Sequence, residues 1–202
     1  VWVEATGRID LNLFPFLVKL EGYPQVVAVS DEQIQRNMKM LRTITEMAKV
    51  RGVEICIANQ NAVLRHVSAC LSEKELEEYN RECVKRLLQA CPDLGALGIR
   101  VMESGKGEDF YRNSYLPAIR ESGRPVHLIM RTWGANREKI MKIAEQYPGE
   151  FSVEIKYNGE HLGLPYHAVT SKKGLHEQDP TYSYEDYTNY PRKYSICLLY
   201  TS

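Results

Sequence analysis

The chain has 202 residues, a formal net charge of +0 at pH 7 and a hydrophobic fraction of 44%. This length and apolar content suffice for one sizeable core, so we expect a single domain. The balanced charge argues against a nucleic-acid or acidic-membrane partner, because such partners select for a basic surface. No run of about 18 apolar residues is present, so no membrane-spanning helix is predicted.

The first elements along the chain are an apolar stretch and a long amphipathic pattern. The stretch from Ile9 to Lys19 predicts an early strand and its loop. Ser30 and Gln33 then have the spacing of a capping box, and apolar residues follow at helical spacing until Gly52. The pattern that begins at Ser30 predicts an amphipathic helix.

The first strong strand-like run extends from Val53 to Ala58 and ends in the polar cluster Asn59 to Asn61. A second capping box, formed by Ser72 and Glu75, precedes another amphipathic helix pattern that ends at Pro92. This segment therefore predicts a strand, a polar loop and a helix.

The next strand-like run, Leu97 to Met102, ends directly at Glu103. A third helix is predicted over residues 108–122. Pro117 fits this helix best as a first-turn residue with Ser114 as the N-cap, so a kinked or split helix is expected.

The last helix and strand signals follow the same order. An apolar run from Val126 to Met130 is followed by Arg131 to Trp133, and a helix pattern begins at Asn136. The run from Ser152 to Ile155 leads into Lys156. Four helices and about five strands are therefore expected.

The periodic pattern ends near position 163. Residues 163–194 are rich in tyrosine, glycine and proline and predict a long loop. The final residues 197–202 resemble the translation of a sequencing-library transposon end, which predicts a non-native tail on a metagenomic fragment. Residues 1–196 are expected to form one catalytic domain.

The repeated rhythm of helix and then strand predicts a parallel α/β sheet, whose ligands gather at the carboxyl ends of the strands. The strand-like runs lack clean polar alternation, as strands covered on both faces do. A complete eight-unit barrel needs about 250 residues. The chain is therefore expected to be an open sheet or a partial (β/α)8 barrel.

Five cysteines are present, and none has CxxC or other metal-ligand spacing. Several lie in apolar helix or strand patterns, where cysteine behaves as a small hydrophobe. We expect reduced, structural cysteines and no metal site. The five are Cys56, Cys70, Cys83, Cys91 and Cys197.

Three strand ends carry side chains suited to sugar chemistry. Glu103 could act as a general acid, or it could be a solvated glutamate beside a helix. Arg131 can form a forked contact with a carboxylate and Trp133 can stack on a sugar ring; a salt bridge and a packed aromatic are the alternatives. Asn59 and Asn61 could bind hydroxyl groups or cap the turn.

The densest polar cluster follows the last strand-like run. Lys156, Asn158, Glu160 and His161 surround an Asn-Gly turn that directs the last two residues back toward the strand end. An acid beside a histidine can position a water, although a charged turn at the rim is the alternative. His161 has no second ligand at metal spacing, so a hydrogen-bonding or packing role is favoured.

The stretch from about Ser30 to Tyr166 resembles the catalytic barrel of the α-glucuronidases of glycoside hydrolase family 67, or of a related glycosidase family. The motifs concerned are a helix and strand ending in Asn59, segment 90–95 leading into a strand that ends at 103–105, and segment 153–159. The resemblance implies a (β/α)8 barrel, truncated here at both ends. It also implies hydrolysis of a plant-type oligosaccharide, such as one from xylan, without a metal or organic cofactor.

The resemblance also implies residue roles. The family's general acid corresponds to Glu103, and the side chains that hold the uronate carboxylate correspond to Arg131 and Lys156. Glu160 would help to activate water, so that hydrolysis inverts the anomeric centre. The candidate catalytic residues are Glu103 and Glu160, and the candidate substrate-binding residues are Asn59, Arg131, Trp133, Lys156, Asn158 and His161.

The chain departs from the family pattern at three points. The family's aspartate lies one residue further from the lysine than Glu160, where this chain has His161. The family's lysine just before the acid is absent, and Arg100 lies one residue out of register. A second base carboxylate would lie on a later strand than the chain contains. Because an open half-barrel exposes apolar sheet edges and should aggregate or fold poorly, we expect little or no activity from this polypeptide alone.

Two other functions fit the same residues. An isomerase or aldolase could use Lys156 to polarise a carbonyl group or to form a Schiff base. A non-catalytic carbohydrate-binding protein could use Trp133 and the tyrosine-rich stretch as a platform. An oligosaccharide is the expected partner of the glycosidase, while a homodimer of the full-length protein and a cytoplasmic or periplasmic location in a bacterium are left open.

Overall fold

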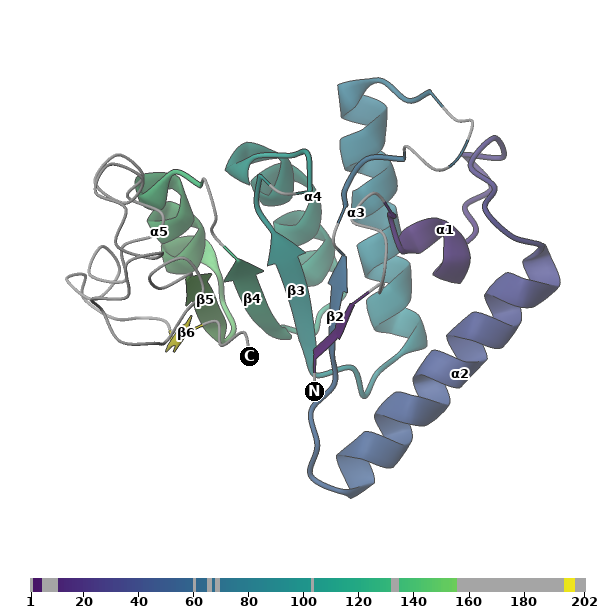
Figure 1. Ribbon diagram of the computed structural model, residues 1–202, viewed down its shortest axis with the longest axis horizontal. Coiled ribbons are helices and arrows are strands. Elements are labelled where there is room, and N and C mark those ends of the chain that lie inside the picture. The colour runs from purple at the N-terminus through teal and green to yellow at the C-terminus, as the bar shows by residue number, and fades with distance from the viewer. Residues whose placement is uncertain are drawn as a thin grey trace, which may run out of the picture.

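The computed structural model describes residues 2–4, 11–59, 61–64, 67, 70–102, 104–131, 135–155 and 195–198. These residues form helices and strands that alternate through the central part of the chain (Figure 1). In chain order the elements are β1 Trp2–Glu4, α1 Phe14–Leu17, α2 Asp31–Val50, β2 Cys56–Asn59, α3 Glu73–Ala90, β3 Ala96–Arg100, α4 Glu108–Glu121, β4 His127–Arg131, α5 Arg137–Gln146, β5 Phe151–Ile155 and β6 Ser195–Leu198.

The six described strands form one sheet in the order β1-β2-β3-β4-β5-β6, and every neighbouring pair is parallel. The strand order never reverses. Because crossovers between parallel strands are right-handed, α3, α4 and α5 must then lie on one face of the sheet. Figure 1 shows these three helices together on the far side of the strands. The predicted α/β fold class with a parallel sheet is confirmed.

The helix starts largely follow the capping signals in the sequence. Ser72 Oγ accepts a hydrogen bond from Glu75 N, and the Glu75 carboxylate accepts one from Ser72 N at 2.8 Å, which completes the predicted box of α3. At α2, Ser30 Oγ accepts from Gln33 N at 3.3 Å. The Gln33 amide donates instead to Asn37 Oδ1 at 2.7 Å, so only half of that box forms.

The strand predicted within residues 9–19 is wrong for the part of this stretch that the structure describes. Residues 14–17 form the short helix α1, and Asn12 Oδ1 accepts a hydrogen bond from Phe14 N at 2.9 Å just before it. Pro15 lies in the first turn, where its missing N–H costs no helix hydrogen bond, whereas a strand ladder would lose a donor there. β1 instead precedes this stretch.

The expectation that Pro117 lies in a first turn after Ser114 is also wrong. α4 runs from Glu108 through Pro117 to Glu121 as one helix. Ser114 does not cap it, because its hydroxyl group donates to Phe110 O at 2.7 Å within the helix. The buried apolar face of α4, which includes Tyr111 and Tyr115, outweighs the proline's cost.

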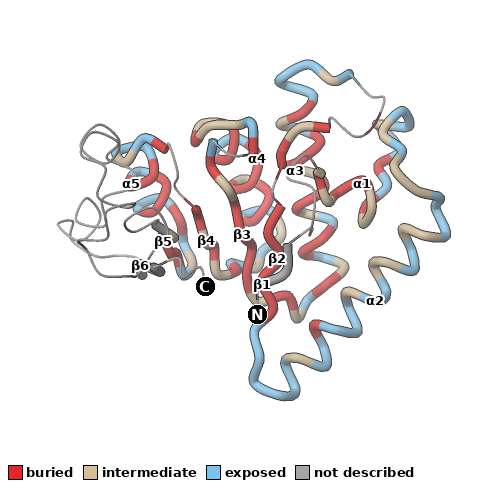
Figure 2. The backbone as a smooth tube through the Cα atoms, in the orientation of Figure 1, coloured by how far each residue is buried: buried red, intermediate tan, exposed pale blue. Residues whose placement is uncertain are grey.

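The core lies between the sheet and α3, α4 and α5. Ile99 and Met130 occupy neighbouring positions on β3 and β4 and are fully buried. They pack with buried side chains of the helices in one hydrophobic cluster. In Figure 2, β2, β3 and β4 are red along much of their length.

α2 is much less covered than the other long helices. Thr45 is the one residue of this helix that is buried. Met40, Met47 and Val50 are 63%, 52% and 85% exposed, and Figure 2 shows the helix mostly in pale blue and tan. None of the helices that the structure describes is both long and apolar enough to cross a membrane.

The predicted loop of residues 163–194 lies outside the described residues. β6 includes the first two residues of the segment 197–202 and pairs with β5. The foreign origin of that segment stays a prediction.

Of the four cysteines whose side chains are described, Cys56, Cys83 and Cys91 are buried and Cys70 is exposed, all as free thiols.

Candidate functional site

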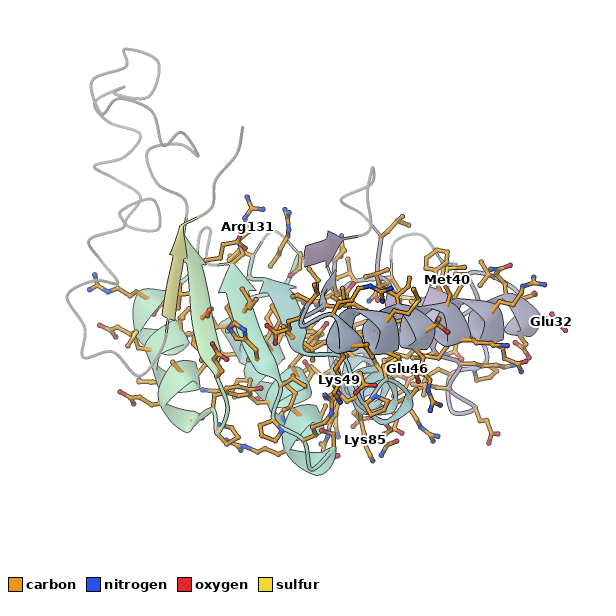
Figure 3. The ribbon with its side chains drawn as sticks, turned by 90° about the horizontal axis from the view of Figure 1, so that it is seen from below. Glu32, Met40, Glu46, Lys49, Lys85 and Arg131 are labelled. Atoms are coloured by element: carbon orange, nitrogen blue, oxygen red, sulfur yellow. The ribbon has the colours of Figure 1, made fainter. Side chains whose placement is uncertain are left out.

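Three charged side chains lie in one row at the carboxyl end of the sheet. Arg100 on β3 is in register with Arg131 on β4, and Arg131 is in register with Glu154 on β5. In-register residues of parallel strands point to the same face, and neighbouring strands lie about 4.8 Å apart. The row therefore places two arginines and one glutamate on the same face of three neighbouring strands, and Figure 3 shows Arg131 at the strand ends.

The face of this row follows from its neighbours. The row one residue earlier on β3 and β4 contains Asn59, Ile99 and Met130. Asn59 contacts Tyr115 of α4, so this earlier row faces the helices. Because side chains alternate along a strand, the row of Arg100, Arg131 and Glu154 lies on the opposite face. In a barrel, that face is the interior.

Arg131 is 7% exposed, which is unusual for an arginine. Its backbone also joins the strand ends, because its carbonyl oxygen accepts a hydrogen bond from Val101 N at 3.0 Å. A buried guanidinium group at this edge is suited to a forked contact with a carboxylate. The structure thus places Arg131 where the sequence predicts a carboxylate-binding residue; its contact with a substrate stays a prediction.

The turn after β3 is tightly closed. Met102 N donates to Lys106 O at 2.8 Å, and Gly105 N donates to Met102 O at 3.0 Å. Met102 has φ 65°, a left-handed conformation that few residues other than glycine adopt. Such strain clusters at functional sites and needs support from its surroundings. Glu103 follows Met102 in the sequence and lies outside the described residues.

Buried hydrogen bonds from α4 hold this turn in place. Ser104 is fully buried, and the Tyr111 hydroxyl group of α4 bonds to its Oγ and donates to Arg100 O at 3.4 Å. Burial raises the pKa of Tyr111 well above its ordinary value, although the hydrogen bond with Ser104 acts in the opposite direction. Tyr111 is therefore a neutral structural donor and not a catalytic base at neutral pH.

Asn59 lies on the face of the sheet that packs against the helices. It is 4% exposed, and its Oδ1 accepts a hydrogen bond from Leu13 N at 3.0 Å. Its Nδ2 donates to Tyr115 Oη at 3.2 Å and to Asn12 Oδ1 at 3.4 Å. These contacts give Asn59 a structural role, and they supply no support for its predicted contact with a substrate.

The carbonyl oxygen of Ala62 joins the loops at this end of the sheet. It accepts hydrogen bonds from Asn12 Nδ2 at 3.0 Å and Asn80 Nδ2 at 3.3 Å, and both asparagines are fully buried. Ala62 N also donates to Ser104 O at 3.1 Å. One network thus fixes the loops after β2 and β3, while Asn61 Oδ1 accepts from Val63 N at 2.9 Å, as expected of a turn cap.

The remaining predicted site residues cannot be placed. Glu103, Trp133, Lys156, Asn158, Glu160 and His161 lie outside the described residues. Their predicted roles stay predictions.

Sequence reasoning did not nominate Arg100 or Glu154 as site residues. Both lie inside the predicted strand runs 97–102 and 152–155, and alignment of the runs by their ends matches Arg131 with Glu103 and Lys156 instead. The sequence carried no signal for the buried asparagines either, because their partners are distant in the chain. Within the described part of the chain, no group of three His, Cys, Asp or Glu side chains could hold a metal ion.

Comparisons with known proteins bear on the fold. No protein-family model matches the chain, and no curated protein matches it. A solved structure of a GH138 enzyme targeting pectin rhamnogalacturonan II is similar, with a TM-score of 0.62 and 21% sequence identity over 74% of this chain. The match covers 20% of that protein, so this chain spans about a fifth of its length. The likeness supports the fold, an α/β arrangement of helices over a parallel sheet.

Proposed function

We propose that the chain is part of a glycoside hydrolase that acts on a sugar carrying a carboxylate group. The observation that carries this proposal is the row of Arg100, Arg131 and Glu154. Two like charges on directly neighbouring strands repel each other, and an anion between them removes that cost. Glu154 offers one carboxylate to the row, and the carboxylate of a uronic acid would offer a second.

The row has the chemistry that a uronic acid requires. A guanidinium group binds a carboxylate through two parallel hydrogen bonds, and burial strengthens them. Lys156 follows β5 directly and would supply a further positive charge. Trp133, two residues after Arg131, would stack on the sugar ring. Asn158 and His161 would contact hydroxyl groups.

The chemical step would use two carboxyl groups. Glu103, three residues after the end of β3 in the sequence, would protonate the leaving oxygen. Glu160 would activate water on the opposite face of the sugar, which gives inversion and requires no cofactor.

The barrel architecture belongs to this proposal. The strand order never reverses and α3, α4 and α5 lie on one face, as in a (β/α)8 barrel and unlike a doubly wound sheet. The likeness to the GH138 enzyme supports an α/β fold of this kind. We infer that residues 1–196 form an arc of such a barrel, with the active site at the carboxyl ends of its strands.

The sugar would be a glucuronide or a galacturonide. The resemblance to family 67 favours α-glucuronides, such as those on xylan, whereas the similar GH138 enzyme targets pectin. Both sugars present a carboxylate to the same arginine row. They differ at the 4-hydroxyl group, so the binding preference between the two decides the substrate class.

Binding of uronic acids to the chain tests the proposal. We expect glucuronate or galacturonate to bind measurably in a calorimetric titration, and glucose and galactose to bind at least about 10-fold more weakly because they lack the charge-assisted hydrogen bonds. Arg131→Met should weaken uronate binding by roughly 10-fold or more. Arg86→Met, which removes an exposed arginine from α3, is the matched control. Equal binding of neutral and acidic sugars would contradict the proposal.

A further inference from the structure

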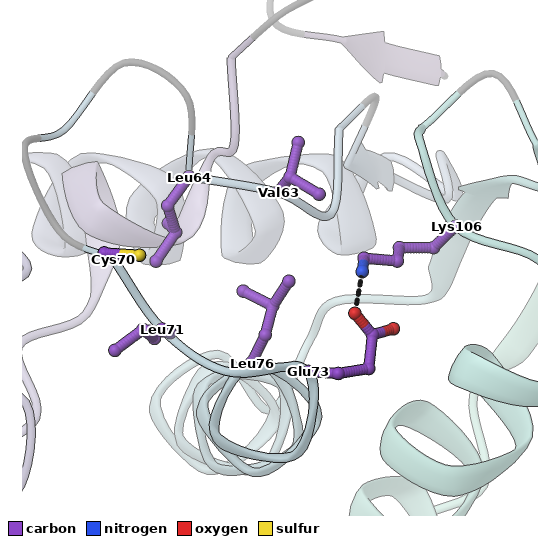
Figure 4. A pocket seen from close by; sticks show the side chains of 7 residues that line it. All are labelled: Val63, Leu64, Cys70, Leu71, Glu73, Leu76 and Lys106. Atoms are coloured by element: carbon purple, nitrogen blue, oxygen red, sulfur yellow. Dashed lines mark hydrogen bonds and ion pairs between the residues drawn. The ribbon is translucent and has the colours of Figure 1, made fainter.

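A cavity of about 290 Å³ opens beside the loops that follow β2 and β3. It lies at the same end of the sheet as Arg131, because both loops leave the carboxyl ends of their strands. Its lining residues are Val63, Leu64, Cys70, Leu71, Glu73, Leu76 and Lys106 (Figure 4).

The walls of the cavity are aliphatic. Val63 and Leu64 come from the loop after β2, and Leu71 and Leu76 come from the start of α3. Leu64 and Leu76 are 7% and 5% exposed, so the apolar surface is built into the fold. Because an apolar cavity of about 150 Å³ can bind benzene, this one can hold a ring with a substituent.

One ion pair faces the cavity. Lys106 Nζ contacts the Glu73 carboxylate, and the Lys106 side chain is 14% exposed. Lys106 Nζ also lies 5.5 Å from the centre of the Phe110 ring. Ammonium has three donors and a carboxylate has about four acceptor positions. A neutral hydroxyl group can therefore accept from Lys106 and donate to Glu73 without separating them, whereas an anion would have to compete with Glu73.

Lys106 belongs to the closed turn that follows β3. The hydrogen bonds from Met102 N to Lys106 O and from Gly105 N to Met102 O fix this turn. The fold therefore holds the backbone of Lys106 in place beside the cavity.

We propose that this cavity binds a compact apolar ring carrying a neutral hydroxyl group. This preference for a neutral, apolar alcohol rests on the cavity and its ion pair and not on the proposed glycosidase function, so the two can be tested apart.

Cys70 gives a direct reporter of occupancy. Its side chain lines the cavity and is exposed, whereas Cys56, Cys83 and Cys91 are buried. Burial also raises the pKa of Cys91 to about 11, which keeps that thiol protonated at neutral pH. A ligand in the cavity should shield Cys70 from an alkylating reagent.

The experiment measures the rate at which iodoacetamide alkylates Cys70 in the folded chain, read by mass spectrometry of its peptide. Benzyl alcohol at about twice its dissociation constant should slow the reaction about threefold, because only the free cavity reacts. Benzoate at the same concentration should leave the rate unchanged. Glutathione in the same solution controls for direct effects on the reagent.

Two variants sharpen the result. Val63→Phe fills the cavity from a half-buried position, so benzyl alcohol should no longer protect Cys70. Lys106→Met removes the ammonium donor and should reduce protection by the alcohol. Absence of saturable protection in the unmodified chain, or equal protection by benzoate, would overturn the inference. Protection of Cys70 without uronate binding at Arg131 would keep the cavity as an alcohol site and reject the glycosidase assignment.

Discussion

At the residue scale, polar side chains at the strand ends divide into two groups by the face on which they lie. Arg100 and Arg131 lie on the face opposite the helices, where a ligand can reach them in a barrel. Asn59 lies on the helix face and holds a loop in place. The sequence predicts a polar residue at each strand end. It does not predict the face of the sheet on which that residue lies, because side chains alternate between the faces and the exact end of the strand decides the face.

Replacement of Asn59 by alanine tests its structural role. Asn59→Ala leaves the partly buried Leu13 N–H without its acceptor and removes the buried hydrogen bond to Tyr115, so the free energy of unfolding should fall by roughly 2 kcal/mol in urea denaturation. Asn113→Ala is the control, because Asn113 makes an exposed contact with Glu77 on the helix surface. An Asn59→Ala variant with unchanged stability but weaker sugar binding would instead show that Asn59 binds substrate.

At the element scale, local signals predicted the helix starts and strand cores well. Ser72 and Asn136 cap α3 and α5 as their spacing predicts. The two failures both involve proline: residues 14–17 are helical, and Pro117 lies inside α4. Proline restricts the backbone only locally, and the burial of Tyr111 and Tyr115 is a tertiary effect that local propensity does not contain.

The proline in α4 leads to a stability prediction. An interior proline costs a helix about 3 kcal/mol through a lost hydrogen bond and a steric clash. Its replacement also makes the unfolded chain more flexible, which favours unfolding by roughly 1 kcal/mol. Pro117→Ala should therefore raise the free energy of unfolding by about 1 kcal/mol or more. Pro15→Ala in the first turn of α1 should lower it, and a gain of similar size there would refute the explanation.

The capping box of α3 should contribute to acid sensitivity. Hydrogen bonds from Ser72 lower the pKa of Glu75 below its ordinary value of 4.5. A lowered pKa in the folded state adds stability that is present above the unfolded pKa and is lost as the pH falls through the folded pKa. Glu75→Gln can keep the cap without this titration.

Urea denaturation at a series of acidic pH values measures the effect. The free energy of unfolding should fall less steeply with decreasing pH in Glu75→Gln than in the unmodified chain. Glu145→Gln, which removes an exposed carboxylate from α5, is the control. An identical pH dependence in the Glu75 variant and the unmodified chain would show that the cap does not contribute.

At the scale of the whole molecule, the strand order of the described sheet never reverses, and α3, α4 and α5 all lie on one of its faces. The alternation of helices and strands predicted a parallel sheet, but it could not give the order of the strands, because order depends on contacts between distant segments. The register of β3, β4 and β5 then brings Arg100, Arg131 and Glu154 together. The sequence predicted Arg131 in this site. It did not predict Arg100 and Glu154, because the register of the strands also depends on contacts between distant segments.

The outer edges of the described sheet lead to the prediction that the isolated chain has little hydrolytic activity. β1 and β6 are the outermost of its six strands, and unpaired strand edges favour association. Gel filtration with light scattering should show self-association that increases with concentration. Efficient turnover of an aryl glucuronide or galacturonide by a monomeric chain would contradict this expectation.

The central claim is that the strand ends form one site for an acidic sugar. A crystal structure of the chain with a bound uronic-acid disaccharide tests it most directly. We predict the sugar carboxylate between Arg100 and Arg131, and the carboxyl groups of Glu103 and Glu160 on either side of the glycosidic bond, about 6.5–9.5 Å apart. A sugar bound elsewhere, or Glu103 and Glu160 on separate sides of the molecule, would contradict the account.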